Sequence, residues 1–269
     1  MKKWFFLIIS LLFINIGISK EISAETIERK DFSHYFEGIE KGTFVLYDES
    51  NDQHLIYNLP QSEKRLSPCS TFKIYNSLAG LEYKVLDSKD KKTLKKWDGS
   101  PQPYDSWKKD HTLSSAIQNS VVWYFQELAT QIGETKMQVF LNKINYGNKD
   151  ISGGLTTFWL RSSLEISAQE QVDLIHKLYS GELPIKAKNI EILKKNITLY
   201  NQDGVHMMGK TGSGDEEGKW VLGWFVGVVE KDGKRYFFAT NIEGSDGAYG
   251  GKAKNITFSI LKELGITKE

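Results

Sequence analysis

Strand-like segments lie only near the two ends of this chain, and they enclose a long middle region with helical periodicity. The middle region spans roughly residues 70–197, where apolar residues recur every three to four positions. Strands are expected at 43–47, 54–58, 205–210, 219–230 and 235–242, and a last helix at about 252–264. The simplest architecture is an α+β fold: both chain ends build one antiparallel sheet, flanked by helices, with an inserted helical lobe.

Local signals support individual boundaries in this scheme. Ser167, with Glu170 three residues later, forms a capping box and predicts that a helix begins there and runs to Gly181. Asp232-Gly233 suits a tight hairpin turn between the last two strands. Gly265 is a typical residue for the end of the final helix.

The first 24 residues have the pattern of a secretory signal peptide. Lys2 and Lys3 precede an apolar run from Trp4 to about Ile18, and Ala24 provides a small residue for cleavage. We therefore expect residues 25–269 to form one mature domain, secreted or periplasmic, with no stable membrane insertion after cleavage. An uncleaved anchor is disfavoured because the run is shorter than the ~20 residues that a membrane span needs.

Charge, cysteine and histidine content disfavour several classes of function. Residues 1–24 contain three lysines and one glutamate, so their removal changes the formal net charge from +1 to −1. No basic excess remains to attract nucleic acid. The single cysteine, Cys69, cannot form an internal disulfide, so the fold must depend on its apolar core. We expect no metal, because the five histidines lack ligand spacing: His34, His54, His111, His176 and His206.

Ser70 and Lys73 stand three residues apart at the head of a predicted helix, which places them on one face. A serine hydroxyl is a poor nucleophile until a base removes its proton. A lysine can be that base only when neutral, which requires an apolar setting that lowers its pKa. The Ser-x-x-Lys pattern alone is weak, since it recurs at Ser88, Ser106 and Ser259, where a solvated lysine is expected.

Two further elements distinguish Ser70 from those repeats. Ser120 places a second hydroxyl within the helical middle, and Lys210-Thr211-Gly212 is the only Lys-Thr-Gly in the chain. Gly212 lies on a predicted strand, where it permits a ligand to approach the backbone closely. Together these residues provide a nucleophile, a base, a proton relay and a cation, which are the parts that acyl transfer requires.

The ordered set of motifs resembles the serine β-lactamase and penicillin-binding protein superfamily, and within it the class D, oxacillinase-type β-lactamases. The segments that carry the resemblance span most of the mature chain: STFK at 70–73, SVVWYFQ at 120–126, YGN at 146–148, FWL at 158–160, KTG at 210–212 and GWFVG at 223–227. The fold that this family implies agrees with the α+β architecture inferred from the sequence pattern.

The resemblance implies that β-lactam antibiotics are the substrates and that Ser70 is acylated by the lactam carbonyl. Lys73 would be carboxylated by carbon dioxide or bicarbonate to N6-carboxylysine, and this carbamate would be the general base. Val121 and Val122, which follow Ser120, would help to keep the Lys73 amine neutral. No separate cofactor is implied.

The remaining site residues also come from the resemblance. Ser120 would pass a proton to the leaving nitrogen, and Lys210 would supply positive potential. Backbone N–H groups of Ser70 and Ser213 would form the oxyanion hole. The other expected substrate-side residues are Thr211 for the substrate carboxylate, Gly212 on the same strand, Trp159 as donor to the carbamate, and Val122 with Leu160 around the modified lysine. YGN at 146–148 is expected to be structural.

One departure from the family pattern leaves substrate binding open. Class D enzymes commonly carry an arginine just before the last helix, but here Lys252 or Lys254 would have to replace it, without the bidentate guanidinium fork. Preference among β-lactams is expected to depend on the loops near 97–107 and 214–219. The oligomeric state is left open.

Other classes of protein share parts of this pattern. A penicillin-binding or sensor-like protein would be acylated at Ser70 but turn over poorly, and a cell-wall transpeptidase would be acylated by a peptide. An ordinary esterase is disfavoured because the chain has no Gly-x-Ser-x-Gly elbow.

Overall fold

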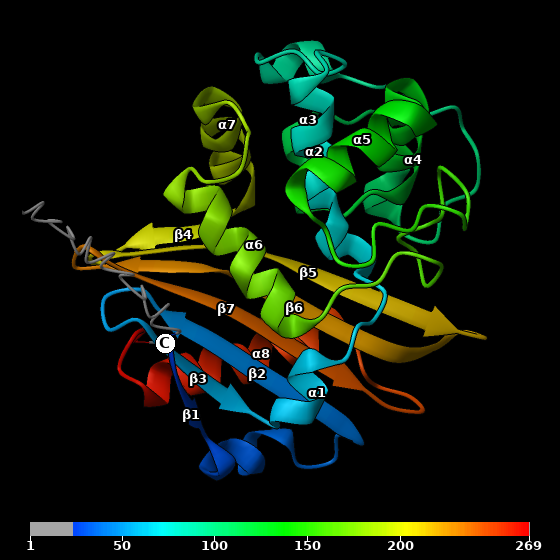
Figure 1. Cartoon of the computed structure of the whole chain (residues 1–269). Coiled ribbons are helices and arrows are strands. Elements are labelled where there is room, and N and C mark those ends of the chain that lie inside the picture. Colours follow the sequence, from blue (N-terminus) through cyan, green and yellow to red (C-terminus); the bar gives the residue numbers. More distant parts are fainter. Residues whose placement is uncertain (1–23, 269) are drawn as a thin grey trace, which may run out of the picture.

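The structure is a computed structural model that describes residues 24–268 (Figure 1). The predicted signal peptide therefore lies outside the described residues, apart from Ala24. Within residues 24–268, no helix has the length and apolar character needed to cross a membrane.

Seven strands form one sheet, as the two-ended pattern predicts. The strand order is β1-β3-β2-β7-β6-β5-β4, so β7 from the C-terminal part lies beside β2 from the N-terminal part. The strands are β1 (Glu25–Glu28), β2 (Lys41–Asp48), β3 (Gln53–Tyr57), β4 (Thr198–Gln202), β5 (Val205–Glu216), β6 (Lys219–Lys231) and β7 (Lys234–Glu243). All five predicted strands are present.

Two edge strands differ from the expectation. β1 and β4 were not predicted, and β1 pairs in parallel with β3, so the sheet is not entirely antiparallel. All four residues of β1 are exposed, and its sequence has no apolar alternation that could indicate a strand. β1 is a strand because its backbone pairs with that of β3, and no local sequence pattern predicts this pairing.

The helices lie on both faces of the sheet. On one face, α6 packs against β2, β6 and β7, and Figure 1 shows the helical lobe beside it; on the other face, α8 packs against β5, β6 and β7. The helices are α1 (Leu59–Glu63), α2 (Lys73–Glu82), α3 (Leu113–Gln118), α4 (Val122–Ile132), α5 (Glu134–Ile144), α6 (Ala168–Ser180), α7 (Ala187–Ile197) and α8 (Gly250–Glu263). Four short 3₁₀ segments are η1 (Lys30–Phe36), η2 (Cys69–Phe72), η3 (Asp90–Thr93) and η4 (Asp105–Trp107).

The alternation of strand side chains divides the core into two layers. Along β6, Trp224, Val226 and Val228 are buried on the side of the helical lobe, whereas Phe225 and Val229 are buried on the side of α8 and η1. The sheet is therefore covered on both faces. The predicted capping box is confirmed, since Ser167 accepts from the Glu170 backbone and Glu170 accepts from the Ser167 backbone.

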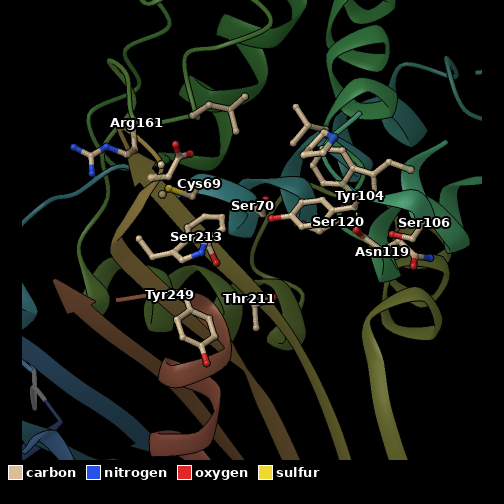
Figure 2. Close-up of a pocket in the computed structure, with 18 residues that line it drawn as sticks. Cys69, Ser70, Tyr104, Ser106, Asn119, Ser120, Arg161, Thr211, Ser213 and Tyr249 are labelled. Atoms are coloured by element: carbon tan, nitrogen blue, oxygen red, sulfur yellow. Dashed lines mark hydrogen bonds between the residues drawn. The ribbon is translucent and has the colours of Figure 1, made fainter. Parts of the chain in front are cut away.

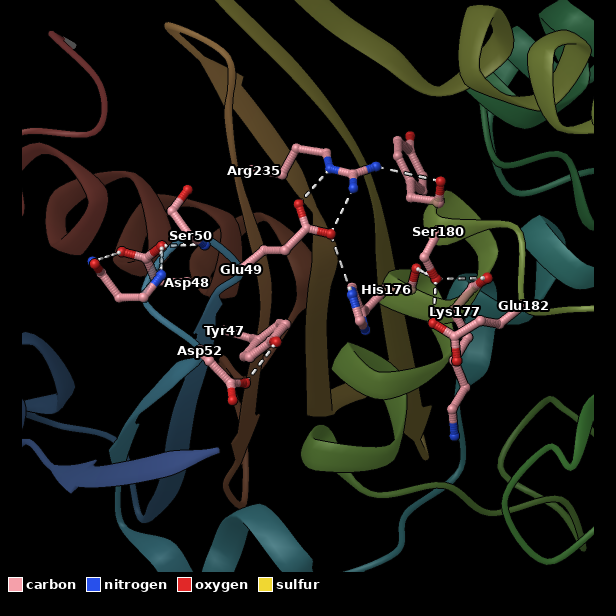
Figure 3. A network of polar contacts seen from close by, with 12 residues as sticks. Tyr47, Asp48, Glu49, Ser50, Asp52, His176, Lys177, Ser180, Glu182 and Arg235 are labelled. Carbon is pink, nitrogen blue, oxygen red and sulfur yellow. Dashed lines mark hydrogen bonds and ion pairs between the residues drawn. The ribbon is translucent and has the colours of Figure 1, made fainter. Parts of the chain in front are cut away.

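A network of charged side chains joins the turn after β2 to α6 and β7 (Figure 3). Arg235 donates to both Glu49 carboxylate oxygens at 2.6 Å, and His176 Nε2 lies 3.3 Å from the same carboxylate. Close by, Tyr47 donates to Asp52 at 2.9 Å, and Lys177 pairs with Asp173 at 2.7 Å. The Glu49 and Asp173 carboxylates of this region are thus each paired with a basic side chain.

Candidate active site

Ser70 and Lys73 meet where η2 runs into α2. Ser70 lies in the 3₁₀ segment and Lys73 is the first residue of the α-helix. Because a 3₁₀ turn has three residues, positions i and i+3 eclipse, which brings the two side chains closer than an α-helix would. Lys73 Nζ lies 2.5 Å from Ser70 Oγ. The preceding Cys69 has a left-handed backbone (φ +49°) and a buried thiol, and so turns the chain sharply ahead of the nucleophile.

The Lys73 side chain is completely buried in apolar surroundings. Its Nζ lies 5.7 Å from the centre of the Phe125 ring, and no carboxylate among residues 24–268 pairs with it. Burial, together with the charge of Lys210, holds the pKa of Lys73 well below its usual range. The neutral amine that the sequence predicts is therefore supported. Lys91, Lys109 and Lys262, the lysines of the other three Ser-x-x-Lys repeats, are exposed as expected.

Ser120 and Lys210 form a second pair on the other side of Ser70. Ser120 lies between α3 and α4 with a left-handed backbone (φ +56°), which points to a position fixed by its surroundings. Lys210, on β5, donates to Ser120 Oγ at 3.1 Å and to the Thr211 carbonyl at 2.9 Å. Burial lowers the pKa of Lys210 to about 7, so this lysine can gain or lose a proton near neutrality.

Close packing brings β5 against the nucleophile. A Cβ on Gly212 would stand 2.8 Å from the Pro68 carbonyl oxygen and 3.3 Å from Ser70 N, so a glycine is needed here. Ser213 Oγ accepts a hydrogen bond of 2.9 Å from the Gly250 backbone, which ties β5 to the start of α8. The Lys-Thr-Gly strand therefore forms one wall beside Ser70.

These elements enclose a cavity of about 760 Å³ (Figure 2). Six of the predicted site residues line it: Ser70, Ser120, Val122, Leu160, Thr211 and Ser213. The other four, Lys73, Trp159, Lys210 and Gly212, are buried and are not among its lining residues. The structure thus gathers residues from four separate motifs, together with Ser213 after KTG, around one cavity, while their chemical roles stay predictions.

Trp159 bears on the predicted carboxylation of Lys73. Its side chain is fully buried against Phe72 and Phe158, yet the indole Nε1 has no hydrogen-bond partner among the described residues. A buried indole N–H normally has an acceptor. The buried, uncharged Lys73 amine and an unpaired donor fit a carbamate, which would supply an acceptor and a negative charge.

The basic residue of the cavity wall is neither of the two lysines predicted to replace the missing arginine. Neither Lys252 nor Lys254 lines the cavity, and the Lys254 ammonium lies 5.2 Å from the Phe258 ring centre. The basic residue among the lining is Arg161, which the sequence analysis did not single out although it directly follows FWL. The assignment of Lys252 or Lys254 to the substrate carboxylate stays a prediction.

Other lining residues were also not identified individually from the sequence. They include the aromatic side chains Tyr104, Trp107, Trp220 and Tyr249, as well as Asn119 and Asp215. Tyr104, Trp107, Asp215 and Gly218 fall within the two loops expected to govern substrate preference. Trp220 and Tyr249 lie next to recognised segments, and only the fold shows that they face the cavity.

The YGN segment has the supporting position expected for it. A Cβ on Gly147 would stand 2.0 Å from the Glu165 carbonyl oxygen, so the backbone approaches too closely for any other residue. Asn148 donates to the Ser163 carbonyl at 2.7 Å and accepts from the Glu165 backbone at 3.0 Å. These contacts hold the loop that carries Trp159 and Leu160.

Comparisons with known proteins agree with this geometry. The penicillin-binding protein transpeptidase domain matches residues 42–263. The probable β-lactamase YbxI of Bacillus subtilis is 39% identical over 272 residues, which cover 99% of each chain. The chain belongs to the penicillin-binding protein and serine β-lactamase superfamily, as a class D member.

Solved structures of a class D β-lactamase and of a penicillin-receptor domain both resemble this chain. The class D β-lactamase BAT-2 is 41% identical, with a TM-score of 0.81 over 88% of this chain and 96% of that chain. The C-terminal domain of the Bacillus licheniformis BlaR penicillin-receptor is 37% identical, with a TM-score of 0.84 over 90% of this chain and 97% of that chain. The superfamily thus includes both an enzyme and a receptor with this fold.

Proposed function

We propose that this protein hydrolyses β-lactam antibiotics through a covalent acyl-serine intermediate and so gives β-lactam resistance. The observation that carries the proposal is the buried Lys73 amine, 2.5 Å from Ser70 Oγ and without an anionic partner among residues 24–268. A lysine in this setting is neutral and can act as a general base, whereas a charged lysine paired with a carboxylate cannot. We infer that the protein acts outside the cytoplasm after removal of residues 1–24.

Acylation begins when Ser70 Oγ loses its proton to the base at the end of the Lys73 side chain. The oxygen bonds to the lactam carbonyl carbon, and the backbone N–H groups of Ser70 and Ser213 stabilise the negative carbonyl oxygen. The carbon–nitrogen bond then breaks. Ser120 Oγ gives its proton to the ring nitrogen and takes one from Lys210, 3.1 Å away.

Deacylation uses the same base as acylation. Before it can begin, solvent must return a proton to Lys210 and remove one from the base. A water molecule gives a proton to the base at the end of the Lys73 side chain, and its oxygen bonds to the ester carbon. The ester carbon–oxygen bond breaks, and the base returns that proton to Ser70 Oγ. Val122 and Leu160, both partly exposed at the cavity wall, control how water reaches this position.

Carboxylation of Lys73 by carbon dioxide would convert the neutral amine into a carbamate, whose anionic oxygen would be the base. The amine is nucleophilic because its pKa is lowered by burial, and Trp159 Nε1 is the donor left for the new group. No separate cofactor is needed.

Turnover of a chromogenic cephalosporin tests the proposal. The full mature protein is mixed with excess substrate, with and without bicarbonate, and intact mass is measured at the end, with Ser70→Ala as the control. Many product molecules per protein, increased by bicarbonate and abolished in Ser70→Ala, are the expected result. Absence of both turnover and adduct would refute an acyl-serine function.

A second candidate is a receptor that keeps its acyl group, favoured by the TM-score of 0.84 to the BlaR domain. It predicts one equivalent of product and a persistent adduct on Ser70. The Val122 side chain argues for hydrolysis, because an apolar neighbour favours the neutral lysine that can recapture carbon dioxide. The same assay separates the two candidates.

A further inference from the structure

One end of the active-site cavity is built from the β5–β6 hairpin and the loop after FWL. The lining residues at this end are Arg161, Gly214, Asp215, Gly218 and Trp220. The β5–β6 register shifts between Gly214 and Asp215, so an irregularity in the strand begins where the wall meets the hairpin. The side chain of Arg161 packs over Gly214, where an added Cβ would stand 2.8 Å from Arg161 Cδ.

The proposed reaction fixes which part of a substrate faces this end. Ser120 protonates the ring nitrogen, so that nitrogen and its ring lie on the Ser120 side of the carbonyl carbon. The acylamino side chain is attached on the opposite side of the same carbon. Figure 2 shows Ser70 between Ser120 and Arg161, so the acylamino side chain extends towards the Arg161 end.

The charges at this end are unequal. Arg161 and Asp215 are the charged residues among those that line the cavity. The Arg161 guanidinium is paired with Glu216 at 3.2 Å, and in Figure 2 it is turned away from Ser70. Asp215 has no hydrogen bond or ion pair from its side chain within residues 24–268. The uncompensated charge at the acylamino end is therefore negative.

We propose that Asp215 determines substrate preference by favouring β-lactams whose acylamino side chain carries a positively charged amino group. The inference rests on the proposed function, because the reaction sets the orientation of the substrate. Opposite charges across a partly exposed cavity attract modestly, and the same carboxylate repels an anionic substituent.

Three penicillins that differ in one group test the proposal: benzylpenicillin, its α-amino derivative and its α-carboxy derivative. Rate constants for Ser70 acylation and kcat/KM are measured at about pH 6.5, where an α-amino group with a pKa near 7.7 is protonated. In Asp215→Asn, the amino-to-benzyl ratio is expected to fall about threefold and the carboxy-to-benzyl ratio to rise about threefold. In the parent, both ratios are expected to move towards the Asn values as salt is added.

Glu217→Gln is the matched control, because Glu217 is an exposed carboxylate on the same hairpin that does not line the cavity. Its ratios are expected to equal those of the parent. Normal acylation by benzylpenicillin with ratios that do not change in Asp215→Asn would overturn the inference and leave the proposed function intact. If Glu217→Gln moved the ratios equally, the general charge of the hairpin would be responsible and Asp215 would have no special role. Absence of acylation by all three penicillins would instead refute the proposed function.

Discussion

Two polar regions of this protein handle charge in opposite ways. In the network beside α6, Glu49 is held by Arg235 at 2.6 Å and lies 3.3 Å from His176 (Figure 3). At the floor of the active site, Lys73 and Lys210 are both buried, and neither is paired with a carboxylate among the described residues. One region joins structural elements, whereas the other buries two lysine side chains in a setting that disfavours their charged forms.

The difference indicates which region is functional. Paired charges that link a turn, a helix and a strand are explained by the fold alone. Two unpaired buried lysines are not, since burial of an uncompensated charge destabilises a protein. Strongly lowered pKa values beside a nucleophile in a cavity are typical of active sites. The uncompensated region is thus the one that requires a chemical explanation.

Lys73→Met should give the largest effect, because it removes the base and keeps side-chain length. We expect kcat/KM to fall about a thousandfold, within the range for loss of a general base, and bicarbonate stimulation to disappear. The midpoint of thermal unfolding in buffer without carbon dioxide should equal or exceed that of the parent, since an apolar chain replaces a buried amine. A large loss of stability would show that Lys73 is part of the structural framework.

Trp159→Phe tests the unpaired indole N–H while keeping an aromatic ring in the core. Loss of a hydrogen bond to a charged group should weaken carboxylation about tenfold. Activity without added bicarbonate should therefore fall, and saturating bicarbonate should restore most of it. Trp224→Phe is the control, because that indole already donates to the Ser67 carbonyl at 2.9 Å. Equal bicarbonate dependence in both variants would contradict a carbamate beside Trp159.

Lys210→Arg tests the charge beside Ser120. Because the pKa of Lys210 is about 7, the positive charge is present below pH 7 and is lost as pH rises through that value. The kcat/KM for anionic β-lactams should therefore fall on the alkaline side in the parent. Arginine stays protonated, so in the variant the charge-dependent fall should move above pH 9. Because the guanidinium cannot give Ser120 a proton, kcat/KM should also be lower than in the parent below pH 7. The measurement is a pH profile of kcat/KM for the parent and the variant. If kcat/KM falls at the same alkaline pH in both proteins, a group other than Lys210 is responsible for the fall.

The sequence predicts the centre of this site better than its rim. Ser70, Lys73, Ser120 and Lys210 carry motifs, and the capped helix at Ser167 follows from local hydrogen-bonding rules. The rim depends on contacts between segments far apart in the chain. Arg161 meets Glu216 only because the loop after FWL folds against the β5–β6 hairpin, and no local pattern encodes that approach. β1 could likewise not be predicted from the sequence. It is a strand because its backbone pairs with β3, and its own composition does not indicate a strand.

Arg235→Met should give the smallest effect and sharpens the contrast between the two regions. The substitution leaves the Glu49 carboxylate with His176 alone, and both members of the lost ion pair are partly exposed, at 32% and 26%. We therefore expect the free energy of unfolding to fall by about 1 kcal/mol, with kcat/KM unchanged. Urea unfolding and the cephalosporin assay measure the two quantities on the same sample.

The matched pair of variants then has opposite signatures: Lys73→Met removes activity without loss of stability, and Arg235→Met removes stability without loss of activity. If Arg235→Met reduced activity several-fold, the two regions would be coupled through α6 and β7, and the division into a structural and a functional set of charges would be wrong.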